Sequence, residues 1–332
     1  MSKELVTYLV FGGVLILALV FDLGLLSKKN KTVTIRQALM QTLFWVSLAF
    51  AFFVFVWLER GQQTALEYIS GYLMEWSLSI DNIFVFILIF SSFKVKEEYY
   101  GRVLLIGILM AIIFRVIFIT LGVALVNQFH WVLYIFGAFL VYTGYKMFIA
   151  TDDEEFDPHD TRIYRFMTRV LPMIPGDHQG KYVVRDEHGK RRYTILFVVV
   201  IMLAAIDLVF AVDSIPAIMG LVDNSPQHRA DAQLVIYTSN IFAVLGLRSL
   251  FFLLRSAVSK FDYLQQGIAI VLVIIGLKML AAHWIDQWIN KTTQVFISLG
   301  IILICLSGSI FYSITHQKKG VPPPAKSKNH KS

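Results

Sequence analysis

The sequence predicts an all-α membrane protein, a polytopic helix bundle of about nine transmembrane helices with two inverted three-helix repeats. Of its 332 residues, 57% are hydrophobic and only 16% are charged, whereas a soluble domain is about a quarter charged. Several apolar runs reach about 20 residues, the length that a helix needs to cross ~30 Å of hydrocarbon. Because lipid offers the backbone no hydrogen-bond partner, these runs are expected to be helices. An internal repeat of ionisable residues, between 74–86 and 206–218, also predicts this architecture.

The expected elements follow from the apolar runs in chain order. An N-terminal signal peptide is not favoured, because Lys3 is the only early cation and no small-residue cleavage site follows the apolar run. The predicted segments are two N-terminal transmembrane helices in 1–58 (5–26 and 38–58), a first three-helix repeat in 66–150 (66–92, 103–126 and 131–150), a cytoplasmic loop in 151–193, a second three-helix repeat in 194–285 (194–220, 233–258 and 264–285), a last transmembrane helix in 293–315, and a disordered cytoplasmic tail in 316–332.

The loop charges predict the orientation. Loops on one side hold 22 lysines and arginines, whereas the other side holds only Lys3, Arg60, Arg229 and Lys291. Cytoplasmic loops carry the excess of positive charge, so the N-terminus is expected outside and the C-terminus in the cytoplasm. The net charge of +7 then suits an anionic inner leaflet rather than a nucleic acid. With no organelle transit signature, the sequence predicts a multi-pass protein of the bacterial inner (plasma) membrane.

The 151–193 loop begins with an acidic run at 152–160 and turns basic toward 190–192. Charge blocks of this kind are usually solvated, so a plain solvated linker is predicted. A cytosolic metal-sensing role for the acidic run is the alternative.

Two segments of the chain repeat one pattern of ionisable residues. MEWSLSIDNIFVF at 74–86 aligns with IDLVFAVDSIPAI at 206–218, and each unit continues with an arginine and a lysine at nearly the same spacing. Three helices per unit reverse the direction of the chain, so the units are expected to be inverted, as in many secondary transporters. The repeated positions are Glu75, Asp81, Arg115 and Lys146 in the first unit and Asp207, Asp213, Arg248 and Lys278 in the second.

Charged residues inside the apolar runs point to a functional site. Each costs at least ~2.5–3.5 kcal/mol near a helix centre, a cost tolerated where charges pair or line a polar cavity. Six helical residues turn about 240°, so Glu75 shares a face with Ser79 and Asn82 rather than with Asp81. Carboxylate, amide and hydroxyl oxygens suit manganese, magnesium or calcium, not copper(I). The candidate metal-site residues are Asp22, Glu75, Asp81, Asn82, Asp207, Asp213 and Asn240, and the candidate charge-pairing residues are Arg115, Arg248, Lys146 and Lys278.

Two alternatives stay open for these charges. The acids and arginines can pair only to hold helices together, and Lys146 and Lys278, near helix ends, can reach toward the membrane surface. Pro216 removes the hydrogen bond to the Val212 carbonyl and can kink the helix there, which frees a carbonyl ligand beside Asp213.

The quoted segments, with TSNIFAVLGLR at 238–248, resemble the TerC family and its Alx-like branch over about residues 8–315. The resemblance implies a membrane protein of the LysE-like transporter superfamily, associated with manganese export and with tellurium-resistance loci. It also implies metal-site roles for Glu75, Asp81, Asn82, Asp207, Asp213 and Asn240. Family members often carry a glutamate where this chain has Ala204, which affects the expected metal preference.

The preferred hypothesis is a transporter that exports divalent cations, with manganese(II) as the preferred ion. It would work by alternating access at a carboxylate site between the repeats. No GxxxxGK[ST] motif is present, so an ion gradient or the membrane potential would drive it. The alternative is a tellurium- or stress-resistance scaffold without transport. An enzyme is not expected, because no HExxH or GxSxG motif occurs, and direct tellurite transport disagrees with an acidic site.

The sequence predicts no tightly bound cofactor, only the transported cation. The expected partners are membrane lipids and the metal ion. The spacing of Gly137 and Gly144 permits close helix packing and a homo-oligomer.

Overall fold

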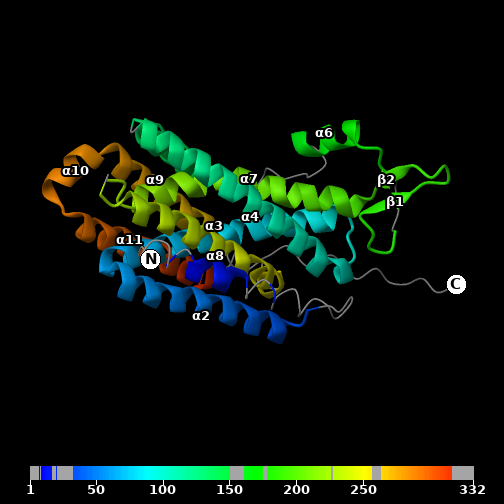
Figure 1. Cartoon of the computed structure of the whole chain (residues 1–332), viewed down its shortest axis with the longest axis horizontal. Coiled ribbons are helices and arrows are strands. Elements are labelled where there is room, and N and C mark those ends of the chain that lie inside the picture. Colours follow the sequence, from blue (N-terminus) through cyan, green and yellow to red (C-terminus); the bar gives the residue numbers. More distant parts are fainter. Residues whose placement is uncertain are drawn as a thin grey trace.

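A computed structural model of the chain describes residues 7, 9–16, 20, 33–129, 131–149, 161–174, 178–225, 227–255 and 263–315. The helices run along the length of the molecule and form an elongated bundle (Figure 1). A two-stranded hairpin lies at one end of the bundle, and a short helix, α10, lies at the other. The elements are α2 (Ile35–Arg60), α3 (Gln62–Ser92), α4 (Glu97–Gln128), α5 (Val132–Ile149), α6 (Arg162–Val170), β1 (Val183–Arg185), β2 (Arg191–Tyr193), α7 (Ile195–Leu221), α8 (Arg229–Leu254), α9 (Leu264–Leu280), α10 (Ala282–Trp288) and α11 (Lys291–Thr315).

The chain is an all-α polytopic membrane bundle. Among the described residues, six helices are long and apolar enough to span a bilayer, namely α2, α4, α5, α7, α8 and α11. A seventh span results if α9 and α10, which meet at an angle of 79°, count as one. α3 packs inside the bundle against α2, α7, α8 and α11. Its 31 residues correspond to ~46 Å, more than the hydrocarbon thickness.

The described helices differ from the expected spans at a few places. The span expected at 264–285 is straight only to Leu280, where the chain bends into α10. α7 stays α-helical through Pro216 to Leu221, so the proline does not end this helix. Most of the first expected span, including Asp22, and the whole tail 316–332 lie outside the described residues.

The 151–193 segment contains more structure than the expected solvated linker. α6 packs on α7, and β1 pairs antiparallel with β2 through Val184 and Arg192. The described residues 161–174 and 178–193 therefore contain regular structure, because short segments with high charge can still fold when a few apolar side chains dock on the bundle. The acidic run lies outside the described part.

Helices α5 and α9 cross at small residues. A Cβ atom on Gly137 would lie 3.0 Å from the Gly276 carbonyl oxygen, and one on Gly144 would lie 2.7 Å from the Ala269 carbonyl oxygen. In the register that aligns Lys146 with Lys278, Gly137 corresponds to Ala269 and Gly144 to Gly276. The two contacts are therefore equivalent under exchange of the two repeat units.

The same register relates a second pair of close contacts. A Cβ on Gly71 in α3 would lie 3.0 Å from Ser239 Oγ in α8, and a Cβ on Gly107 in α4 would lie 3.2 Å from Leu203 Cβ in α7. Gly71 corresponds to Leu203, and Gly107 corresponds to Ser239. A two-fold axis in the membrane plane between inverted units would produce matched contacts of this kind.

Candidate functional site

The side chain of Arg115 joins the two repeat units at the centre of the bundle. From α4 it donates two hydrogen bonds to Asp207 on α7, from Nε to Oδ2 at 2.6 Å and from Nη2 to Oδ1 at 3.0 Å. Its Nη1 also donates to Asn240 Oδ1 on α8 at 2.6 Å and to Glu75 Oε1 on α3. This bidentate arrangement makes full use of the planar guanidinium group.

All four side chains are closed off from the surface. Glu75 and Asn240 have no exposed area, Arg115 is 1% exposed and Asp207 is 2% exposed. Each lies within a few residues of the midpoint of its helix. The cluster is therefore near the membrane midplane, where binding sites of inverted-repeat transporters occur. With both carboxylates ionised, two negative charges face one positive charge.

Helical periodicity places further polar groups beside this cluster. Ser79 and Asn82 follow Glu75 on one face of α3, as expected from the spacing, and Ser214 follows Asp207 by seven residues, two turns along α7. All three side chains are buried, at 0%, 1% and 1% exposure. The apolar surroundings leave these hydroxyl and amide groups few partners.

Several buried polar atoms have no hydrogen-bond partner among the described residues. Those on the four helices around Arg115 include Glu75 Oε2, Ser79 Oγ, Oδ1 and Nδ2 of Asn82, Ser214 Oγ and Asn240 Nδ2. Leaving a buried donor or acceptor unsatisfied costs about 1–3 kcal/mol. Such groups in a folded protein call for an explanation, such as water, an ion or a substrate.

The remaining predicted metal-site residues do not all meet at Arg115. Asp213 is partly exposed and accepts a hydrogen bond from Thr143 on α5, because six residues turn it away from Asp207. Asp22 and the side chain of Asp81 lie outside the description. In the described ranges, no three His, Cys, Asp or Glu side chains are close enough to one another to hold a metal ion.

The other charge-pairing candidates have different surroundings. Arg248 is buried on α8, at 4% exposure. Lys146 is exposed at the end of α5, whereas Lys278 is half-buried and its Nζ donates to Ser298 Oγ at 3.3 Å. The two lysines occupy equivalent repeat positions but differ in exposure.

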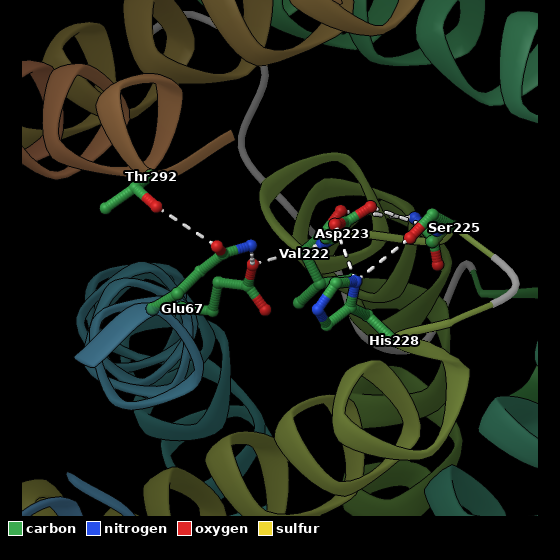
Figure 2. Close-up of polar contacts among 8 residues, drawn as sticks. Glu67, Val222, Asp223, Ser225, His228 and Thr292 are labelled. Atoms are coloured by element: carbon green, nitrogen blue, oxygen red, sulfur yellow. Dashed lines mark hydrogen bonds and ion pairs between the residues drawn. The ribbon is translucent and has the colours of Figure 1, made fainter. Parts of the chain in front are cut away.

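A second group of polar contacts (Figure 2) lies near α10, and residues of both line one cavity. Glu67 Oε1 accepts a hydrogen bond from the Asp223 amide at 3.2 Å, and Asp223 Oδ2 lies 3.2 Å from His228 Nδ1. Ser225 Oγ lies 3.1 Å from the same histidine nitrogen. Glu67 precedes Glu75 by eight residues, about 12 Å along α3.

A cavity of about 370 Å³ borders this second group. Its lining includes the acidic residues Glu67, Asp223 and Asp286 and the basic residues Lys278 and His283. Sequence reasoning did not identify this cavity. Glu67 lies near the start of an apolar run, and the other acids lie in short connections, so no periodic pattern marked them.

The chain is similar to known membrane proteins over most of its length. Residues 60–320 match the family model described as integral membrane protein TerC family. An uncharacterized membrane protein of Myxococcus xanthus is 40% identical over 304 residues, covering 92% of this chain and 90% of the relative. Another, from Rickettsia bellii, is 36% identical over 308 residues, 93% of this chain and 97% of the relative.

A third relative has a name that suggests a role. Alx of Escherichia coli strain K12, provisionally named a membrane-bound redox modulator, is 35% identical over 326 residues, covering 95% of this chain and 98% of Alx. No solved structure has significant similarity to the chain.

Proposed function

The chain belongs to the TerC family of integral membrane proteins, and we propose that it is a transporter that exports divalent metal cations, with manganese(II) as the preferred ion. The observation that carries the proposal is the buried ion-pair cluster in which Arg115, from the first repeat unit, binds Asp207 of the second. In this proposal, Arg115 occupies the cation site as an internal counter-ion, and a transported ion displaces it.

Charge balance favours a divalent ion. If Arg115 moves away, Glu75 and Asp207 leave two negative charges in a region of low dielectric, where an unpaired charge is costly. One divalent cation neutralises both carboxylates, whereas a monovalent cation leaves one negative charge. Two carboxylates and the Asn240 oxygen form a hard, all-oxygen ligand set of the kind that manganese and magnesium prefer.

The unpartnered oxygens near the cluster support a path for the ion. Ser79 Oγ, Asn82 Oδ1 and Ser214 Oγ are buried without a partner among the described residues, so they can accept contacts from a hydrated or partly dehydrated cation. The cavity lined by Glu67, Asp223 and Asp286 would supply an acidic opening at the end that the loop charges predict to be outside the cell.

The matched contacts of the two repeat units support alternating access. Rocking of one unit against the other would break the bond between Arg115 and Asp207, because these residues belong to different units. It would also slide α5 past α9 at Gly137 and Gly144, where small residues allow close helix approach. Transporters with inverted repeats move in this way around a fixed central site.

The test is whole-cell elemental analysis after manganese loading. Cells with the wild-type protein should contain less manganese than cells with Glu75→Gln at equal expression. Glu97→Gln is the matched control, since Glu97 also pairs with an arginine, Arg255, but is 57% exposed at the bundle end. Equal manganese content in wild-type and Glu75→Gln cells would reject export through this site.

The second candidate function is a tellurium- or stress-resistance scaffold without transport, in which the buried charges only hold the helices together. The close pairing of Arg115 with two acids is the observation that favours it. A scaffold should tolerate exchange of the charges, as in Arg115→Asp with Asp207→Arg, whereas a cation site should not. A redox role through a disulfide within this chain is excluded, because Cys305 is its one cysteine.

A further inference from the structure

Helix α6 presents two different faces to its surroundings. Ile163, Tyr164 and Met167 pack on the bundle, and Met167 is only 5% exposed. The Tyr164 ring lies 5.3 Å from the ring of Phe93, which directly follows the last residue of α3. The contact places α6 beside the end of a helix long enough to cross the membrane, and hence at the level of the membrane surface.

The opposite face of α6 combines apolar and basic side chains. Phe166 is 67% exposed and Val170 is 57% exposed. They lie four residues apart, so they form one exposed apolar ridge. Arg165 and Arg169, also four residues apart and exposed, form a parallel basic ridge beside it. Thr168 is exposed too, but its hydroxyl donates to the backbone of its own helix.

This pairing of ridges matches the boundary between lipid headgroups and acyl chains. A helix in that region buries aromatic and aliphatic side chains by several ångströms while its arginines contact anionic headgroups. Water would leave Phe166 and Val170 exposed, and a purely apolar surface would remove the exposed charge of the arginines from water, which is costly. An anionic lipid surface satisfies both ridges at once.

We propose that the face of α6 formed by Arg165, Phe166, Arg169 and Val170 binds anionic phospholipids at the membrane surface. The arginines contact lipid phosphates, and Phe166 and Val170 enter the acyl boundary. The hairpin at the same end adds Arg185 and Arg191, both exposed, which strengthens the attraction to negative lipid. The site is independent of cation transport and fixes the 161–193 segment against the membrane.

Hydrogen exchange of the full-length protein in nanodiscs tests the proposal. One nanodisc contains phosphatidylcholine alone, and the other contains phosphatidylcholine with about 30% phosphatidylglycerol. Each basic residue near an anionic surface strengthens binding to that surface severalfold. Phosphatidylglycerol should therefore hold α6 against the membrane and slow exchange of its backbone amides by roughly tenfold. Exchange in α4 serves as the measure of an intact fold.

Two double variants make the test specific. Arg165→Gln with Arg169→Gln should abolish the effect of phosphatidylglycerol on α6, whereas Arg185→Gln with Arg191→Gln, which removes equal charge from the hairpin, should retain most of it. No lipid effect in the wild type would overturn the proposal and would favour an acidic protein surface as the partner. An equal loss in both double variants would also overturn it, because the effect would then be one of general charge.

Discussion

Replacement of Arg115 by glutamine tests whether this side chain stands in for a cation. Arg115→Gln leaves Glu75 and Asp207 buried at 0% and 2% exposure without their positive partner. Removing one partner of a buried ion pair costs about 3–5 kcal/mol of unfolding free energy. If the carboxylates form a cation site, manganese should restore much of this loss, since a ligand at 100 times its dissociation constant stabilises by about 2.7 kcal/mol.

The assay is unfolding of the purified protein in detergent, with a chelator or with manganese. Manganese should stabilise Arg115→Gln more than the wild type, in which the ion must first displace the guanidinium group. Arg255→Gln is the control, because its partner Glu97 is exposed and such surface pairs contribute at most about 1 kcal/mol. If manganese stabilises neither Arg115→Gln nor the wild type, or stabilises Arg255→Gln equally, the counter-ion argument fails.

Two further predictions concern packing and pH. Gly144→Ala should destabilise the bundle by about 1–3 kcal/mol, because the added methyl group would meet the Ala269 carbonyl at 2.7 Å. Gly300→Ala, in which the methyl group faces open space within α11, should stabilise by up to about 1 kcal/mol in the same unfolding assay. The Arg192 guanidinium holds the pKa of the Asp186 carboxyl below its ordinary value of 3.8. This lowered pKa stabilises the hairpin above about pH 4, and the stabilisation is lost as the pH falls through the folded-state pKa. The protection factors of the hairpin amides, which correct exchange for its intrinsic rate at each pH, should therefore be constant from pH 7 to 5 and fall below about pH 4, except in Asp186→Asn.

The fold could largely be predicted from the sequence, because the membrane imposes simple rules. Each long apolar run must be a helix, and the described helices α2–α5, α7–α9 and α11 occupy the expected ranges to within several residues. The bend after Leu280 was not predictable, because apolar residues continue past it through Ala281 and Ala282 to Ile285. The α6 and hairpin elements were missed since a short amphipathic helix in a charged loop gives little hydropathy signal.

The candidate site was only partly predictable. Periodicity placed Glu75, Ser79 and Asn82 on one face, and all three are buried. The partner of Arg115 was not predictable, because Asp207 lies 92 residues away and tertiary contacts leave no periodic mark. Asp213 has the same acidic character as Asp207 in the repeat, yet it faces Thr143 rather than the cluster.

Manganese flux into proteoliposomes containing only the purified protein tests the central claim most directly. The wild type should carry manganese across the bilayer, and Asp207→Asn, which removes one of the two carboxylates that hold Arg115, should abolish the flux while Glu97→Gln retains it. Absence of flux through the wild type, or equal flux through Asp207→Asn, would contradict cation transport at this site.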